Sequence, residues 1–223
     1  MIAVKSFLRR MIELPLFQGL SQTDLEDVAG HTKLGFLRVA SRKPIVQEGD
    51  ACTNVFLLMT GEANVVSYAD DGSYSITESL KAPAVFQLEC LFGFTQRHTR
   101  SFIARSHCQL ITMSKMEVLS LCERNEIFRL NLLNNLSTYS QRCARHPWRQ
   151  KPSTIRQKLF RFLEDRTLRP AGQVTLRMKM TALAQYIGES RLNVSKELNA
   201  MQEEGLLRFS RGIIHITAIE KLR

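Results

Sequence analysis

The residues best suited to chemistry with a partner lie in one segment near the C-terminus, residues 180–207. After Ser190, the sequence places Arg191, Asn193 and Lys196 close together on a predicted helix. An arginine fork can donate two hydrogen bonds to a guanine edge, and an asparagine amide matches an adenine edge. Lys196 supplies a point charge suited to a phosphate. This set of side chains predicts a helix that contacts the major groove of a nucleic acid.

Two short helices joined by a tight turn would position these side chains. Thr181 is the predicted N-cap of the first helix. Ala184 is small enough for two helices to approach closely, and Gly188 suits the turn between them. Val194 can pack the second helix against the first. These offsets are typical of a helix-turn-helix, whose second helix reads the groove.

A wing extends the predicted contact surface. Residues 206–217, LLRFSRGIIHIT, read as two strands around Ser-Arg-Gly. Hydroxyl groups suit phosphate oxygens, and a leucine suits the methyl group of thymine. The predicted DNA contacts are Thr181, Ser190, Arg191, Leu192, Asn193, Lys196 and Arg211. The alternative is a winged helix that uses the same basic face to dock on protein.

The charge distribution favours the nucleic acid. The 223 residues include 31 Lys and Arg against 21 Asp and Glu, a net charge of +10. Residues 151–223 alone hold 14 basic and 7 acidic residues. Such a surplus indicates an acidic partner, either nucleic acid or an anionic membrane surface. No segment approaches the roughly 20 apolar residues that span a bilayer, and the N-terminus lacks a signal-peptide core. We therefore expect a cytoplasmic protein with no membrane partner.

The rest of the chain predicts an α+β protein. Residues 34–113 alternate apolar β-rich runs with turn clusters, which is typical of an antiparallel β-roll. After them, helices are predicted at 115–124, with Ser114 as N-cap, and at 125–145. Pro147 and Pro152 bracket a break. The predicted domains are a β-roll at 1–124, a dimerisation helix at 125–146, a hinge at 147–152 and a winged helix-turn-helix at 153–223.

The long predicted helix carries one apolar stripe. Its members recur at spacings of four, four, three and four, and they are Phe128, Leu132, Leu136, Tyr139 and Cys143. A narrow stripe of this kind suits a coiled coil with a second copy of the chain. The alternative is that the stripe packs against the chain's own β-roll.

Three segments resemble the Crp/Fnr family of bacterial transcription regulators. They are LFQGLSQTDLEDVA at 16–29, IVQEGDACTNVFLLMTGEANVV at 45–66 and LAQYIGESRLNVSKELNAMQEEGLL at 183–207. The resemblance covers nearly the whole chain. It implies a homodimer that binds an inverted-repeat DNA site and works with RNA polymerase. Two-fold symmetry would place the two recognition helices about one DNA turn apart, roughly 34 Å.

The chain departs from the family's best-known members at two sites. Leu192 stands where their recognition helix has a glutamate, so a different half-site is expected. Cyclic-nucleotide-binding members carry Gly-Glu-Leu and then Arg-Ser or Arg-Thr. Here Arg100-Ser101 matches, but Gln87-Leu88 replaces Gly-Glu and Glu89 comes one place late. We therefore expect no binding of cyclic AMP, and either another small molecule in a pocket that includes Glu89, Arg100 and Ser101 or no ligand at all.

The cysteines and histidines leave the signal open. The first of the five cysteines is Cys52, which argues against the N-terminal iron–sulfur cluster of some members. A haem or metal sensor using Cys143 and His146 is one alternative, and thiol redox sensing is another. No catalytic motif is present, so we expect no enzyme. A further alternative is a β-roll subunit whose basic domain contacts protein.

Overall fold

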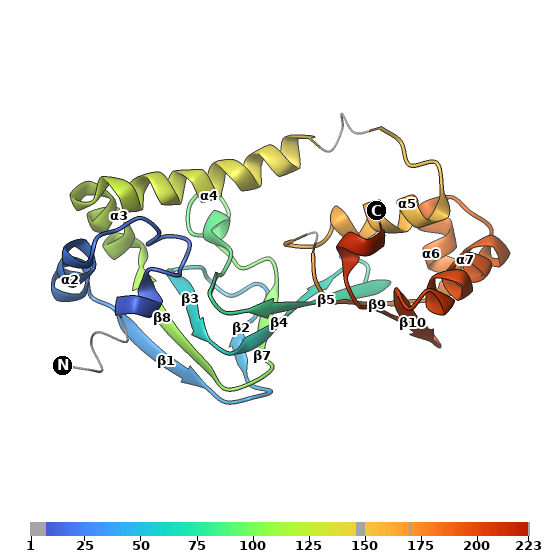
Figure 1. Cartoon of the computed structure of the whole chain (residues 1–223), viewed down its shortest axis with the longest axis horizontal. Helices are drawn as coiled ribbons and strands as arrows, with labels where there is room; N and C mark the ends of the chain where they lie inside the picture. The colour runs from blue at the N-terminus through green and yellow to red at the C-terminus, as the bar shows by residue number, and fades with distance from the viewer. Residues whose placement is uncertain (1–7, 146–149, 170, 223) are drawn as a thin grey trace. The chain divides into compact units, whose positions relative to one another are not determined.

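The computed structural model describes residues 8–145, 150–169 and 171–222, with the side chain of residue 145 excepted (Figure 1). The chain forms two compact units. The β-roll unit comprises Met1–Ala63 and Leu80–Arg145, and the C-terminal unit comprises Asn64–Ser79 and His146–Arg223. This division differs from the sequence-based one, because Asn64–Ser79 belongs with the C-terminal unit. The predicted hinge falls partly on residues 146–149, which lie outside the described residues.

The β-roll unit contains most, but not all, of the antiparallel strands that the sequence predicts for it. Four of them form a sheet in the order β1-β8-β3-β6, namely β1 (Gly35–Val39), β3 (Asn54–Thr60), β6 (Ala84–Val85) and β8 (Cys108–Ser114). A second pair joins β2 (Pro44–Val46) to β7 (Ser101–Ala104). Gly61 follows β3 at a φ of +96°, and a Cβ there would collide with the carbonyl oxygen of His107. The turn therefore requires glycine.

Capped helices complete this unit, and their caps agree with the sequence. The helices are α2 (Gln22–His31), α3 (Lys115–Arg124) and α4 (Glu126–Arg145), with a 3-10 turn, η1, at Leu88–Cys90. Ser21 and Asp24 form a capping box at the start of α2. The hydroxyl of Ser114 accepts a hydrogen bond from the Glu117 backbone N–H at 3.2 Å. These caps fix where each helix begins.

The N-terminal part of the α4 stripe faces the subunit's own core, whereas Tyr139 and Cys143 are exposed. Phe128 is fully buried and Leu132 is 6% exposed, and both belong to the main apolar cluster of the β-roll unit. The rings of Phe17 and Phe128 lie 5.4 Å apart, and Leu136 packs at the edge of the cluster. Assigning Phe128 and Leu132 to the face for a second copy was therefore wrong. Packing them in the subunit's own core removes these large apolar side chains from water without a second copy of the chain.

The C-terminal unit packs three helices against an antiparallel sheet (Figure 1). The helices are α5 (Ile155–Glu164), α6 (Met180–Ile187) and α7 (Arg191–Glu203), followed by a 3-10 turn, η3 (Ile219–Leu222). The strand order is β10-β11-β9-β5-β4. The strands are β4 (Glu62–Tyr68), β5 (Tyr74–Lys81), β9 (Val174–Met178), β10 (Leu207–Ser210) and β11 (Ile213–Ile216). The predicted wing, β10 and β11, is thus the edge of a larger sheet.

Strand β5, like β4, belongs to this sheet, although the sequence analysis placed both strands in the β-roll. Its Ile76 is 1% exposed and lies opposite Leu176 of β9. The buried carboxylate of Glu78 accepts hydrogen bonds from the backbone N–H of Leu168, at 2.8 and 2.9 Å, and of Arg169. β5 therefore contributes both a core side chain and a satisfied buried charge to the C-terminal unit.

None of the helices within the described residues combines the length and the apolar character needed to cross a bilayer.

Candidate nucleic-acid interface

The helix-turn-helix forms at the residues that the sequence predicts. Gly188 ends α6 in the left-handed conformation, with a φ of +66°. The hydroxyl of Ser190 then caps α7 by accepting a hydrogen bond from the Asn193 backbone N–H at 3.1 Å. Ala184 and Val194, which are 4% and 1% exposed, pack the two helices onto a shared core.

Thr181 does not cap α6. The helix begins at Met180, and its N-cap is Lys179, which makes no side-chain capping bond. The strand β9 ends at Met178, so the chain passes directly from strand to helix and α6 starts earlier than predicted. Thr181 lies exposed in the first turn of α6. A hydroxyl at a helix N-terminus can still donate to a phosphate, so its predicted DNA contact stays a prediction.

The outward side of α7 carries the predicted reading residues. Arg191, Leu192, Asn193 and Lys196 are all exposed, and Leu192 is 64% exposed. Leu192 and Lys196 are four residues apart and share one face, whereas Asn193 shares the neighbouring face with Glu197. A large apolar side chain left in water beside two cations is suited to a thymine methyl group.

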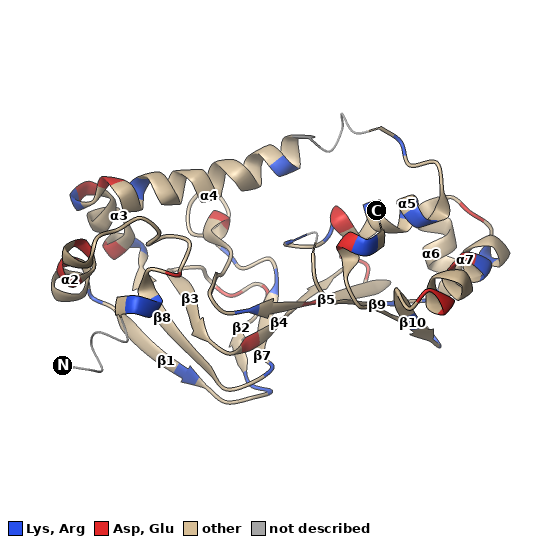
Figure 2. Cartoon of the chain, viewed as in Figure 1, with Lys and Arg blue, Asp and Glu red and all other residues tan. Residues whose placement is uncertain are grey.

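Three acidic side chains in and beside α7 pair with cations of α5, whereas Glu203 is exposed. Glu197 and Glu204 pair with Arg156 of α5, and Glu189 pairs with Lys158. Within the described part of the chain, Arg191 and Lys196 form no ion pair. Figure 2 shows basic and acidic residues on the helices of this unit. The surface left to a partner is therefore more basic than the composition of α7 suggests.

The wing presents a second basic edge. Arg211 and Gly212 form the turn between β10 and β11, and Gly212 has a φ of +72°. The backbone N–H of Met178 donates to the Gly212 carbonyl at 2.8 Å, which holds this turn against β9. Arg211 is exposed there, as predicted. Arg208, which sequence reasoning missed, is exposed on β10 opposite His215. The alternation Leu-Arg-Phe-Ser was the signal for it.

The candidate effector residues gather beside α4. Burial raises the pKa of the Glu89 carboxyl, against the influence of Arg100. Burial also raises the pKa of the Tyr139 hydroxyl, and the neighbouring Glu89 and Cys143 raise it further. The structure thus brings Glu89 and Arg100 near two members of the predicted α4 stripe. Ser101 instead accepts a hydrogen bond from the Glu48 backbone N–H at 3.0 Å.

Gln87 occupies the place of the glycine in the cyclic-nucleotide cassette. Its φ is +22°, which lies in the region that favours glycine. Its side chain is 4% exposed and donates a hydrogen bond to Thr99 at 2.6 Å. The Nδ1 atom of His98 lies 3.3 Å from the Gln87 amide oxygen. At this position a buried side chain therefore fills the space that a glycine would leave open.

The thiols differ in exposure: Cys52, Cys90 and Cys108 are buried, Cys122 is partly buried and the candidate metal ligand Cys143 is exposed. Burial raises the pKa of Cys52 to about 11 and also raises the pKa of Cys90, Cys108 and Cys122. These thiols stay protonated at neutral pH, which makes them poor nucleophiles. His146 lies outside the described residues. Among the residues that are described, no three His, Cys, Asp or Glu side chains are grouped to hold a metal ion.

Comparisons with known proteins agree with this architecture. The family model of the cyclic nucleotide-binding domain matches residues 36–125, and that of the Crp-like helix-turn-helix domain matches residues 157–223. None of the curated proteins compared with the chain matches it significantly.

Solved structures of transcription regulators are similar to the chain at low sequence identity. The sensor domain of the transcriptional regulator DNR from Pseudomonas aeruginosa is 19% identical, with 70% of this chain and 99% of that chain covered and a TM-score of 0.54. The catabolite activator protein of Thermus thermophilus is 22% identical, with 93% of this chain and 96% of that chain covered and a TM-score of 0.47. FixK2 from Bradyrhizobium japonicum is 17% identical, with 85% of this chain and 96% of that chain covered and a TM-score of 0.47. With a β-roll of the cyclic-nucleotide-binding type, a long helix and a Crp-like helix-turn-helix in that order, the chain belongs to the Crp/Fnr family of DNA-binding transcription regulators.

Proposed function

We propose that the protein is a homodimer that reads an inverted-repeat DNA site through α7 and the wing. The observation that carries this proposal is the charge arrangement of α7. Glu197, and Glu204 at the C-cap, are paired with Arg156 of α5, while Arg191, Leu192 and Lys196 face outward. A regulator of this kind works in the cytoplasm and acts on RNA polymerase, which we include in the proposal. Its β-roll responds to an effector other than cyclic AMP.

A heptad row on α4 supports the second copy. Leu130, Leu133, Ser137, Ser140 and Ala144 are all exposed and recur at spacings of three, four, three and four. Leu130 and Leu133 are 50% and 52% exposed. The spacing is that of positions a and d in a two-stranded coiled coil. The three small residues of the row would let two helices approach closely along its C-terminal half.

Substitutions on α7 test the proposed reading. The probe is a duplex selected from a random pool by the wild-type protein, compared with poly(dI·dC) in gel shifts over a salt series. Arg191→Ala is expected to weaken binding to the selected duplex by about 1–3 kcal/mol and to relax one base preference. Lys196→Ala is expected to weaken both duplexes and to reduce the salt slope by about one.

Lys221→Ala removes an exposed cation from η3 of the same unit and serves as the matched control. It is expected to leave base preference unchanged. If neither α7 variant alters DNA affinity, α7 is not the recognition helix. If the wild-type protein binds every duplex equally, the basic unit is a docking module for protein instead.

The effector proposal has its own experiment. Gln87 fills the cassette position that cyclic-nucleotide binding leaves to glycine, so calorimetric titration with cyclic AMP is expected to give no binding heat. Gln87→Gly combined with Leu88→Glu restores the family's Gly-Glu pair and is expected to gain heat. Saturable binding of cyclic AMP by the wild-type protein would contradict the proposal. An absorption spectrum and native mass spectrum of the same sample report any haem or retained ligand.

A further inference from the structure

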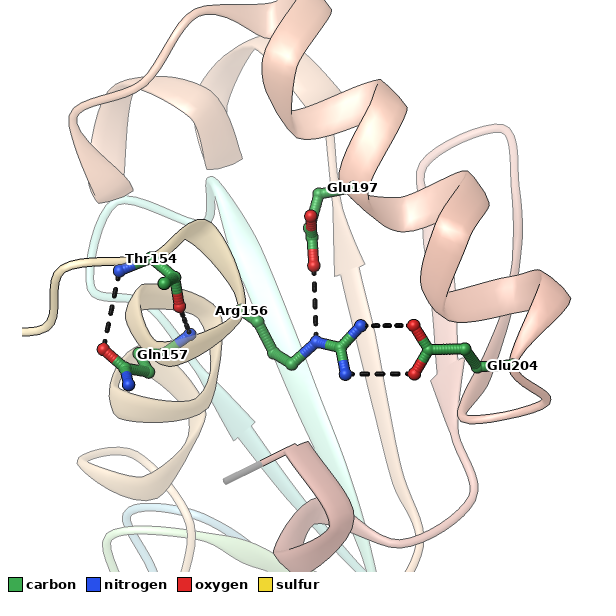
Figure 3. Close-up of polar contacts among 5 residues, drawn as sticks. All are labelled: Thr154, Arg156, Gln157, Glu197 and Glu204. Atoms are coloured by element: carbon green, nitrogen blue, oxygen red, sulfur yellow. Dashed lines mark hydrogen bonds and ion pairs between the residues drawn. The ribbon is translucent and has the colours of Figure 1, made fainter.

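The first turn of α5 is held in a fixed conformation. Thr154 is its N-cap, and the Thr154 hydroxyl accepts a hydrogen bond from the Gln157 backbone N–H at 3.2 Å. The Gln157 side-chain oxygen in turn accepts from the backbone N–H groups of Ser153 and Thr154. Such a capping box satisfies the free N–H groups of the first turn. Arg156 therefore projects from a backbone whose direction is already set (Figure 3).

Arg156 makes hydrogen bonds to two carboxylates of the helix-turn-helix. Its two terminal nitrogens donate to the two oxygens of Glu204 at 3.0 and 2.6 Å, and its Nε donates to Glu197 at 3.3 Å. Figure 3 shows the guanidinium plane facing both partners. The fork geometry restricts the orientation of the pair, which a lysine at this position could not do.

The two carboxylates lie on one face of α7. Glu197 and Glu204 are seven residues apart, which is two helical turns, and Glu204 is the C-cap of α7. Leu192 and Lys196 lie on a different face. Holding α7 at two points two turns apart fixes its rotation about its own axis relative to α5. That rotation decides which side chains face the DNA.

Resting on the proposal that α7 reads the DNA, we propose that Arg156 is a positioning residue for recognition. It makes α7 turn with α5, the first helix after residues 147–152. Lys158 of α5 adds a link to Glu189, which lies directly before the α7 cap. The acidic partners are neutralised by the same contacts, so the link also keeps negative charge away from the reading face.

Charge-preserving variants test this role with the full-length protein, the selected duplex and poly(dI·dC). Arg156→Lys keeps the charge and loses the fork, and it is expected to lower the ratio of specific to non-specific affinity about fivefold. Arg156→Glu and Glu204→Arg are each expected to lower the ratio about tenfold. The double swap re-forms the pair with the opposite polarity and is expected to recover most of the loss. The salt slope is expected to stay unchanged for Arg156→Lys and for the swap.

The matched control is Arg161→Lys, which alters another α5 arginine that pairs with Glu164 of its own helix. Its specificity ratio is expected to match the wild type. Any of three results would overturn the proposal. The first is an unchanged ratio of specific to non-specific affinity in Arg156→Lys and both single reversals, and the second is an equal loss of affinity for both duplexes with a smaller salt slope. The third is no recovery of the ratio in the double swap, provided that its thermal unfolding matches the wild type. Arg191→Ala is measured alongside. If it has no effect while the Arg156 variants behave as expected, the base-contact assignment fails and the positioning role stands.

Discussion

Ile76→Ala is expected to destabilise the C-terminal unit by about 2–5 kcal/mol. The residue is 1% exposed and belongs to the same apolar cluster as Leu176 of β9 and Val194 of α7. Truncating it removes buried apolar area and leaves a cavity beneath the wing sheet. Hydrogen exchange measured by mass spectrometry is expected to show faster exchange in β9 and β11, with β3 unchanged. Affinity for DNA is expected to fall with it, because α7 packs on the same core.

Tyr68→Ala is the control for this experiment. Tyr68 lies at the end of β4 on the same hairpin but is 60% exposed. Its removal is expected to change the free energy of unfolding by less than about 0.5 kcal/mol. Faster exchange confined to β5 in Ile76→Ala, with β9 and β11 still protected, would show that β5 is only loosely attached.

The double variant Leu130→Glu and Leu133→Glu is expected to convert the dimer into monomers. Four carboxylates would face one another across the proposed row, where desolvated like charges repel. A monomer holds one half-site at a time, so affinity for the inverted repeat is expected to fall by about 10²–10⁴-fold. Sedimentation velocity reports the oligomeric state, and gel shifts on full and half sites report the loss of avidity.

Thr138→Glu places a carboxylate on the exposed side of α4 but off the heptad row. This variant is expected to remain a dimer. The double variant is expected to leave the fold of the subunit intact, because both leucines are about half exposed and neither belongs to the buried core. If the double variant sediments as a dimer with wild-type affinity, the row on α4 does not hold the two copies together.

Features determined by near neighbours were predictable from the sequence. Ser114 and Ser190 cap helices through hydrogen bonds to residues three positions away, so a short pattern contains all the groups involved. Gly188 marks a turn because a left-handed φ favours glycine over every other residue. The residues predicted to read DNA are exposed on α7, and their contacts with DNA stay a prediction. Thr181 was wrongly predicted to be the N-cap of α6. The N-cap is Lys179, which follows the preceding strand and makes no side-chain capping bond.

Features determined by distant partners were not predictable. The run that forms β5 alternates apolar and polar residues in the same way whichever sheet it joins. Its pairing with β9 is decided by Leu176 and Leu168, about a hundred residues further along the chain. On α4 two rows have helical spacing, and the more apolar one was assigned to the partner. The core of the subunit takes the N-terminal part of that row, Phe128 and Leu132, and a weaker row with small residues stays exposed.

The position of β5 affects how this protein could be recombined with others. A chimera that joins a foreign input module at residue 147 would transfer the helix-turn-helix and the wing without Asn64–Ser79. Strand β9 would then become an unpaired edge beside an uncovered apolar patch, which is a template for aggregation. A chimera that carries both Asn64–Ser79 and the segment after residue 147 keeps β5 paired with the edge of β9. The transferable cassette is therefore discontinuous, and modular shuffling at the proline-flanked junction alone is expected to yield insoluble hybrids.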